Sequence, residues 1–502
     1  MPDVMKALLL NPPSFANFDG GASSRWPVTR EIESYWYPVW LTYAAGMLPG
    51  SRLLDACPHK ITPAQTIEIA TDYDFVVLFT STVGFHNDLL LIRKMKARKP
   101  DLKIAFVGPH VQNLPDQSLM ASEDIDFVVR GEFDHAVVEF AQGRPLAEIL
   151  GISYRKDGKV MHTPTRPQLH TEQLDALPFA TEVYKRNLVI ENYNVPFLLH
   201  PFVSLYTTRG CPALCTFCQW PQTISGHAWR VRSTDNVARE IKQALEMFPQ
   251  MKEFFFDDDT FNIRKDRVLE ICQKFKPLKF RWSANARVHS DYETLKAMAD
   301  GGARLFIVGF ESGDPQILKN IKKGATVEMA RAFAKNCKKV GITIHGDFII
   351  GLPGETKETI QCTIDFAKEL DCETVQVSLA HAFPGTELYN DLVKGNFLKA
   401  EALTDGNGHQ LPHIEYPGLT REDMMAGVNR FYDSYYFRPK VAWRIVRKAL
   451  WDAHERKRLY HEAVAFLRLR AERLKYARKG LEKKPVVPMP AIDVGSGPAA
   501  HG

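Results

Sequence analysis

The chain has 502 residues, enough for about three domains, and its 45% hydrophobic and 25% charged residues are typical of a globular protein with large cores. The net charge of +5 is uneven, because residues 441–484 hold 14 Lys and Arg against 5 Asp and Glu, a local +9 that leaves about −4 elsewhere. No apolar run approaches the roughly 18 residues of a membrane-spanning helix.

The first segment, MPDVMKALLLNPPSF, has a short apolar run from Ala7 to Leu10, which predicts a strand rather than a signal peptide. We therefore expect a cytoplasmic protein, in which cysteines stay reduced and clustered ones are available for metal.

Strand-like and helix-like patterns alternate over residues 1–150. Short apolar runs that end in Pro, Gly or polar residues are typical of buried parallel strands. These runs are MKALLLNPP, SRLLDACP, DFVVLFTST, KIAFVGPH and IDFVVRGE. They predict a doubly wound, Rossmann-like α/β domain whose ligand lies beyond the carboxyl ends of the strands. Residues 151–196, including the hairpin-like ISYRKDGKV, are predicted to be a linker.

A second and more regular βα series follows over residues 197–400. Its helical patterns include STDNVAREIKQALEMF, which begins with Ser233 or Thr234 as the N-cap. Six strands are expected, at residues 203–207, 253–257, 280–284, 304–310, 342–350 and 374–380. This series predicts a partial (β/α)6 barrel, in which the chemistry lies on the loops that follow the strands.

Polar and glycine-rich residues follow every one of these strands, which supports a single composite site at one end of the barrel. In chain order they are Cys211, Cys215 and Cys218, Asp257 to Asp259, Asn285, Arg287, Glu311, Ser312, Gly351 and His381. Beyond them, residues 401–485 are predicted to be helical and basic, and the Pro/Gly/Ala-rich residues 486–502 to be a disordered tail.

Three of the eight cysteines lie within eight positions, in the spacing C-x3-C-x2-C from Cys211 to Cys218. A structural zinc site would need a fourth ligand, which no downstream C-x-x-C or H-x3-H motif supplies. Catalysis by a thiol nucleophile needs one cysteine, not three. An iron–sulfur cluster fits the soft thiolate ligands, and three of them would leave one iron of a four-iron cubane open to a small molecule.

The triplet, with Phe217 before its last cysteine, resembles the signature of the radical S-adenosylmethionine (SAM) superfamily. The later segments FFFDDDTF, GFESG, FIIGLPGET and FPGTELY resemble the branch of that superfamily with an N-terminal cobalamin-binding domain. The resemblance implies that SAM chelates the open iron of a 4Fe-4S cluster held by the three cysteines. An electron from the cluster then splits SAM into methionine and a 5′-deoxyadenosyl radical, which abstracts hydrogen from the substrate.

The same resemblance implies further SAM contacts by Phe217, Asp258, Asn285, Arg287, Glu311, Ser312 and Gly351. We expect Asp258, the middle of three carboxylates, to face the SAM ammonium. The resemblance implies that one of Arg287 and Glu311 meets the SAM carboxylate and the other the ribose hydroxyls or the ammonium, although a salt bridge between those two is an alternative. Gly351 would let the backbone approach the adenine. Cobalamin stays an open question, because the chain lacks the D-x-H-x-x-G string of proteins that supply a histidine ligand.

Strings such as FDGGASSR, REIESYWYPVWL, LLHPFVSLYTTRGC and NIKKG resemble the radical SAM proteins of bacterial hopanoid biosynthesis. That resemblance implies a lipid substrate, a hopanoid bearing glucosamine, whose sugar is ring-contracted to a cyclitol ether. Flavodoxin or ferredoxin would be the electron donor. The alternative is a cobalamin-dependent radical methyltransferase, and a rival of another class is a zinc protein that binds nucleic acid.

The basic C-terminal segment, with Trp443 and Trp451 among its cations, has three interpretations: a solvated face, a surface for peripheral contact with anionic lipid at the inner face of the membrane, or a nucleic-acid contact.

Overall fold

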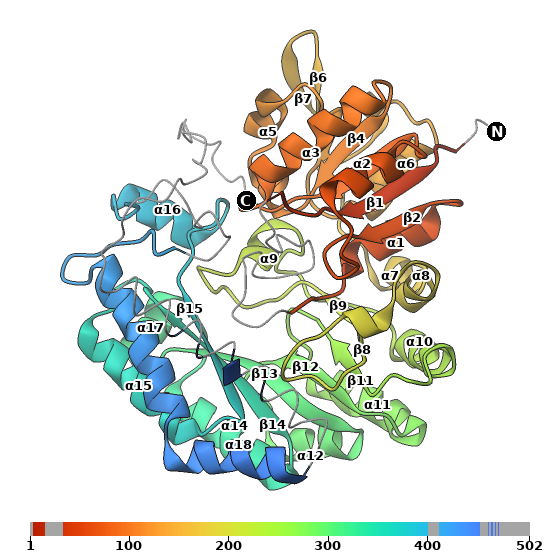
Figure 1. Ribbon diagram of the computed structural model, residues 1–502. Coiled ribbons are helices and arrows are strands. Elements are labelled where there is room, and N and C mark those ends of the chain that lie inside the picture. Colours follow the sequence, from red (N-terminus) through yellow and green to blue (C-terminus); the bar gives the residue numbers. More distant parts are fainter. Residues whose placement is uncertain are drawn as a thin grey trace.

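The computed structural model describes residues 4–15, 34–399 and 411–451, together with residues 460, 463, 464, 467 and 470. Two mainly parallel sheets, each covered by helices, lie one above the other, and two further helices run along the second sheet (Figure 1). The predicted order of a Rossmann-like domain and a partial barrel is confirmed, and helices follow in the described part of residues 401–485. The predicted disordered tail lies outside the described residues.

The first sheet has seven strands in the order β2-β1-β3-β4-β5-β6-β7. Its first five strands are parallel: β1 (Ala7–Asn11), β2 (Arg52–Asp55), β3 (Phe75–Phe79), β4 (Lys103–Val107) and β5 (Phe127–Val129). The hairpin of β6 (Ile152–Lys156) and β7 (Lys159–His162) pairs antiparallel with β5. Residues that sequence patterns assigned to a linker therefore continue this sheet.

Alternate residues of the first sheet enter two separate cores, as a doubly wound domain requires. Leu9 and Val77 face a core shared with α1 (Val39–Met47) and α6 (Asp134–Ala141). The neighbouring Leu8, Leu10 and Val76 face another core. That core is closed by α2 (Pro63–Ala70) and α3 (Phe85–Arg98).

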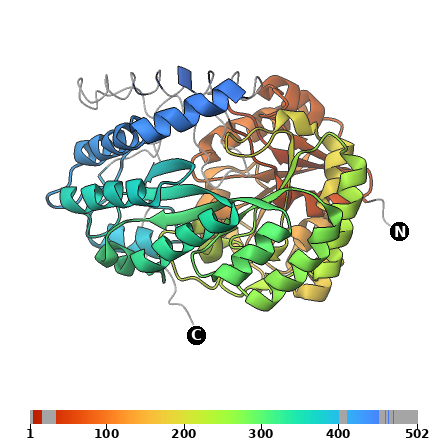
Figure 2. The same ribbon diagram turned by 90° about the horizontal axis from the view of Figure 1, so that it is seen from below.

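The second sheet has six parallel strands in the order β15-β14-β13-β12-β11-β8, and each overlaps a strand expected from the sequence. They are β8 (Phe202–Leu205), β11 (Glu253–Phe256), β12 (Trp282–Ala286), β13 (Ala303–Glu311), β14 (Thr343–Ile350) and β15 (Thr374–Leu379). Helices lie along the outside of these strands (Figure 2). They are α10 (Thr234–Met247), α11 (Lys265–Phe275), α12 (Tyr292–Asp300), α14 (Val327–Val340) and α15 (Lys357–Leu370).

The interior of the barrel contains an aromatic cluster, one ring of which comes from far away in the sequence. On β11, Phe256 contacts Phe275 of the outer helix α11, so it faces outward. Because side chains alternate along a strand, Phe254 also faces outward and Phe255 faces inward. The Trp36 ring lies 5.2 Å from Phe255 and 6.3 Å from Phe197. Residues from the segment before α1 thus pack inside the second domain.

Two helices complete the described fold. Helix α17 (Arg421–Tyr436) packs on α15 and β15, and its Tyr435 hydroxyl donates to the Cys372 carbonyl. Helix α18 (Pro439–Trp451) follows and is fixed by Arg444, which donates to the carbonyls of Cys372 and Glu373 just before β15. Helix α18 therefore lies at the amino-terminal end of the barrel strands.

The carboxyl-terminal edges of both sheets meet at one seam. Helix α4 (Pro109–Asn113), which follows β4, contacts α9 (Gln219–Thr223), which follows the cysteines. Trp220 of α9 stacks on Trp40 of α1 with ring centroids 6.2 Å apart. Arg209 donates two hydrogen bonds to Asp134, at 2.7 and 2.9 Å, and lies 3.5 Å from Glu132. All three of these charged side chains are buried.

Candidate active site

Cys211, Cys215 and Cys218 lie on one loop between β9 (Thr208–Arg209) and α9, at the carboxyl-terminal end of the barrel. Cys211 and Cys215 are buried and Cys218 is half-buried. Burial raises the pKa of the Cys211 thiol, and a hydrogen-bonding contact with the Thr260 hydroxyl at 3.6 Å opposes this rise. The Arg287 guanidinium donates to the Cys215 sulfur at 3.8 Å, which suits a thiolate.

The start of this loop is held from two sides. The Asp258 carboxylate accepts hydrogen bonds from the backbone N–H groups of Thr207 and Thr208 at 2.6 and 2.9 Å, and from the Thr207 hydroxyl at 2.5 Å. Arg267 donates to the Thr207 carbonyl at 3.2 Å. Asp258 is fully buried, which raises its pKa, and the Thr207 hydrogen bond opposes that shift. Asp258 therefore anchors the loop, which differs from the SAM contact expected for it.

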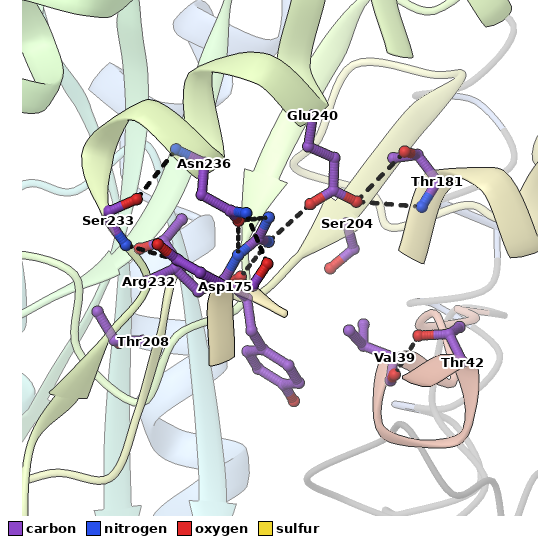
Figure 3. A network of polar contacts seen from close by, with 12 residues as sticks. Val39, Thr42, Asp175, Thr181, Ser204, Thr208, Arg232, Ser233, Asn236 and Glu240 are labelled. Atoms are coloured by element: carbon purple, nitrogen blue, oxygen red, sulfur yellow. Dashed lines mark hydrogen bonds and ion pairs between the residues drawn. The ribbon is translucent and has the colours of Figure 1, made fainter. Parts of the chain in front are cut away.

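Arg232 extends this anchoring into a buried polar network (Figure 3). It pairs with Glu240 at 2.6 Å and donates to the Tyr206 carbonyl at 3.1 Å, one residue before Thr207. Glu240 in turn accepts hydrogen bonds from the backbone and hydroxyl of Thr181. Because a buried charge is costly without its partner, this network fixes the backbone that leads to the cysteines.

Gln222 clamps the middle of the cysteine loop, a role that its sequence position does not reveal. Its side-chain nitrogen donates to the carbonyls of Cys215, Thr216 and Cys218 at 3.1, 3.1 and 2.8 Å. Its side-chain oxygen accepts from the Glu387 N–H at 2.8 Å, in the first turn of α16 (Glu387–Lys394). One carboxamide thus joins the loop to a helix that follows the last barrel strand.

Glu311 and Arg287 lie near each other, and Lys323 comes between them. The Lys323 ammonium pairs with Glu311 at 2.6 Å, and Arg287 donates to the Lys323 carbonyl. Burial raises the pKa of Glu311, and Lys323 opposes that rise. Glu311 has a positive φ of 65°, beside a register shift in the β13–β14 ladder, so its side chain leaves the regular strand alternation.

The remaining predicted residues surround the same strand ends. Asn285 donates to the Asp257 carboxylate at 3.2 Å and to the Asp258 carbonyl at 3.0 Å. Ser312 is buried against the Thr363 hydroxyl of α15 at 3.0 Å, which makes it part of the helix packing. Phe217 is half-buried against the core.

Gly351 has a φ of +96°, a conformation that favours glycine. Its N–H donates to the buried Glu355 carboxyl, and its carbonyl accepts from the Tyr416 hydroxyl at 3.1 Å. Burial raises the pKa of Glu355 to about 8. The turn after β14 is therefore held by a carboxyl group that is mostly protonated at neutral pH.

Two histidines of the last two barrel strands and their loops have structural partners. His345 is in the first half of β14, where its ring stacks on Phe197 at 3.9 Å and its Nδ1 contacts the Thr374 hydroxyl at 2.6 Å. His381 is buried beside His413, with ring centroids 4.6 Å apart, and burial holds its pKa well below the usual range. His345 thus belongs to the aromatic cluster inside the barrel.

The loop fits a cubane cluster. Three thiols lie on one short loop beside the Arg287 guanidinium, and in the described part of the chain no three His, Cys, Asp or Glu side chains form a site for a single metal ion. A cubane makes a different demand, because each of its cysteines binds a different iron. Arg287 and Lys323 supply positive charge beside the thiolates that such a cluster requires.

The facing edge of the first sheet carries small and polar residues on the loops that follow β3 and β4. Thr80, Ser81 and Thr82 follow β3 and are buried, and Gly108 follows β4 with a φ of +113°. A Cβ at Gly108 would lie 2.4 Å from the Thr80 carbonyl oxygen, so the backbones approach too closely for any other residue. His110 contacts Thr82 at 3.3 Å, and burial lowers its pKa to about 3. The space beside Gly108 is thus occupied by the chain itself, and the loops after β3 and β4 are packed closely together.

A Rossmann-like domain whose strand ends face a cysteine-bearing partial barrel defines the class of cobalamin-dependent radical SAM proteins. The superfamily described as Radical SAM matches residues 205–367, and the B12 binding domain matches residues 25–141. The uncharacterized methyltransferase PH0819 of Pyrococcus horikoshii is 32% identical over 450 residues, covering 87% of this chain and 94% of that protein. This chain therefore belongs to the radical SAM superfamily, in the branch with a B12-binding domain.

A further relative and two solved structures are similar to this chain over most of its length. Bacteriochlorophyllide d C-12(1)-methyltransferase of Chlorobaculum tepidum is 31% identical over 325 residues, 64% of this chain and 66% of that protein. The methyltransferase TsrM from Kitasatospora setae, solved with cobalamin and a [4Fe-4S] cluster, has a TM-score of 0.61 at 18% identity, covering 78% of this chain and 74% of that one. OxsB, solved with aqua-cobalamin and SAM, has a TM-score of 0.65 at 17% identity and covers 93% and 72%.

The chain is therefore an enzyme whose cofactors are a 4Fe-4S cluster, SAM and cobalamin. Cobalamin, which the sequence left open, is supported by the family match over its first domain. No described helix is long and apolar enough to cross a bilayer.

Proposed function

We propose that this enzyme is a cobalamin-dependent radical methyltransferase that methylates a carbon of its substrate. The carrying observation is the single seam at which the carboxyl-terminal edges of both sheets meet, joined by Arg209–Asp134 and Trp40–Trp220. A group held at the carboxyl-terminal edge of the first sheet would face the end of the barrel that bears the cysteines. When bound, the cluster and SAM would supply the radical and cobalamin the methyl group.

The residues of the barrel would position these groups. The cysteines would hold the cluster, with Arg287 beside Cys215, and the Glu311–Lys323 pair would present a carboxylate and an ammonium to a zwitterionic ligand such as SAM. Phe217, Asn285 and Gly351 remain proposed SAM contacts. Ser312 and Asp258 are proposed to support the site, because their polar atoms bond to Thr363 and to Thr207 and Thr208.

A second candidate is rearrangement of the sugar headgroup of a hopanoid lipid, favoured by the strings FDGGASSR and REIESYWYPVWL and their resemblance to hopanoid-biosynthesis proteins. Among the similar proteins is the hopanoid C-2 methylase of Rhodopseudomonas palustris, 22% identical over 432 residues, 82% of this chain and 75% of that protein. Both candidates need a one-electron donor of the flavodoxin or ferredoxin kind.

Methionine with a deuterated methyl group separates the two candidates. Cells with and without the gene are grown on this methionine, and their extracts are compared by mass spectrometry. A gene-dependent product that gains the labelled methyl group supports methyl transfer. The opposite result is that cells without the gene lose a cyclitol ether and accumulate its glucosaminyl precursor, while the cyclitol ether of cells with the gene carries no labelled methyl group. That result would refute methyl transfer and establish ring contraction.

A further inference from the structure

Helix α18 presents large apolar side chains to solvent. The exposed fractions of Trp443, Val446 and Leu450 are 63%, 46% and 66%. These residues are spaced i, i+3 and i+7, so they lie on one face of the helix. We name this surface, made of Trp443, Val446 and Leu450, the α18 stripe. Exposed apolar side chains that lie together on one face mark an interaction site more often than scattered single residues do.

Cations border the α18 stripe, while the opposite side of the helix is fixed to the barrel. Arg447 lies at its edge and is exposed, and Lys440 is exposed as well, although its ammonium pairs with Asp371 at 2.7 Å. Arg444, on the barrel side, is mostly buried against Asp371 at 3.5 Å and the carbonyl of Cys372. The stripe also stands at the start of residues 441–484, whose net charge is +9. The helix is therefore held rigidly, with an apolar and basic face outward.

We propose that the α18 stripe docks this enzyme onto the surface of an anionic phospholipid bilayer. Trp, Val and Leu side chains would enter the boundary between headgroups and acyl chains, and Arg447 would meet lipid phosphates. Self-association through this face would bring two strongly basic segments together, which opposes a dimer. Nucleic acid would attract the cations but would leave Val446 and Leu450 without an apolar partner.

The position of α18 makes this docking compatible with catalysis. The helix lies beyond the amino-terminal ends of the barrel strands, at the opposite end of the barrel from α9 and the cysteine loop (Figure 1). A bilayer against the stripe would therefore leave the seam open to an electron donor. The proposal does not depend on which of the two reactions the enzyme performs.

Vesicle sedimentation with the full-length protein tests the proposal without cofactors or turnover. We expect binding to phosphatidylcholine vesicles that contain phosphatidylglycerol, little binding to phosphatidylcholine alone, and release at high salt. The vesicle affinity of the double variant Trp443→Ser, Leu450→Ser should fall at least about tenfold, because burying those side chains supplies the apolar part of the affinity. Both side chains are exposed, so folding should be preserved.

A matched double variant, Leu90→Ser with Met120→Ser, removes exposed apolar side chains from the first domain and should bind like the wild type. Absence of vesicle binding, or equal binding by the Trp443/Leu450 variant, would overturn the proposal. A dimer seen by light scattering that this variant converts to monomer, or binding to duplex DNA in place of vesicles, would assign the face to another partner and overturn it as well.

Discussion

Glu355 is a buried carboxyl group in the turn that follows β14, and only 3% of it is exposed. It accepts the Gly351 N–H, and its Oε1 has no hydrogen-bond partner among the described residues. A neutral carboxyl suits this environment better than a carboxylate does, because an unpaired buried charge is costly. The turn that presents Gly351 should therefore depend on a proton.

This proton makes stability depend on pH. The folded pKa of about 8 exceeds the ordinary value of 4.5, so the stabilisation is full below about pH 4.5 and is lost as the pH rises toward 8. We expect wild-type unfolding free energy to fall relative to Glu355→Gln by up to about 1.4 kcal/mol per pH unit in that window. Denaturant unfolding of both proteins from pH 5 to 9 measures this difference, and parallel curves would contradict it.

At the scale of elements, the cysteine loop is connected to α16 through Gln222. Replacing Gln222 by Leu removes the donors to three loop carbonyls and the acceptor for Glu387, while the side chain keeps a similar volume. The Gln222→Glu substitution would instead place a carboxylate against those carbonyls and beside the cluster. We expect Gln222→Leu to hold less than about half of the wild-type iron and sulfide after reconstitution, since several hydrogen bonds of about 1 kcal/mol each are lost.

The Gln222→Glu variant tests whether this effect is local to the cluster. If it retains a cluster, its reduction potential, followed by EPR during titration, should be more negative than that of the wild type, because added negative charge disfavours reduction. Gln361→Leu, a change at a half-buried glutamine of α15 that bonds to Asp365, is the matched control and should leave iron content and potential unchanged. Cys211→Ala should lose the cluster completely, whereas Cys272→Ala should keep it. Wild-type iron content and potential in both Gln222 variants would refute the clamp.

Patterns in the sequence predicted the elements well but not how they are joined. The six barrel strands and the N-cap Ser233 follow from apolar periodicity and capping chemistry, which are local properties. Gln222 carries no such signal, because its partners are backbone carbonyls whose position depends on the folded loop. Asp258 was expected to contact a ligand because the sequence shows only a carboxylate after a strand. The fold shows that this carboxylate already accepts hydrogen bonds from the N–H groups of Thr207 and Thr208.

Sheet membership shows the same limit. The hairpin at residues 152–162 was recognisable as a hairpin, but its pairing with β5 depends on a strand distant enough that alternation alone cannot identify it. The three cysteines differ from these cases, because the signal for the proposed cluster site lies in their local spacing within eight residues.

At the scale of the whole molecule, the two domains share buried charges. Asp134→Asn would leave the Arg209 guanidinium buried without its bidentate partner, with Glu132 3.5 Å away. We expect a loss of about 3 kcal/mol in unfolding free energy, since breaking a buried pair leaves an uncompensated charge. Tryptophan fluorescence, to which Trp40 and Trp220 at the seam contribute among eight tryptophans, and circular dichroism would follow denaturant unfolding.

Glu68→Gln serves as the comparison for Asp134→Asn, because Glu68 pairs with Arg98 on the surface and its loss should change stability little. Equal stability of Asp134→Asn and the wild type would show that the seam is not held by this pair.

The Trp36 ring inside the barrel means that this enzyme is not modular. The segment that precedes the first helix of the cobalamin-type domain also fills the second domain against Phe255 and Phe197. A barrel expressed from residue 197 onward would have an unfilled interior, and a first domain transplanted from a relative would have to bring a matching aromatic segment with it. The two domains of such a chain are therefore expected to have diverged as a single unit, and exchange of one alone should fail.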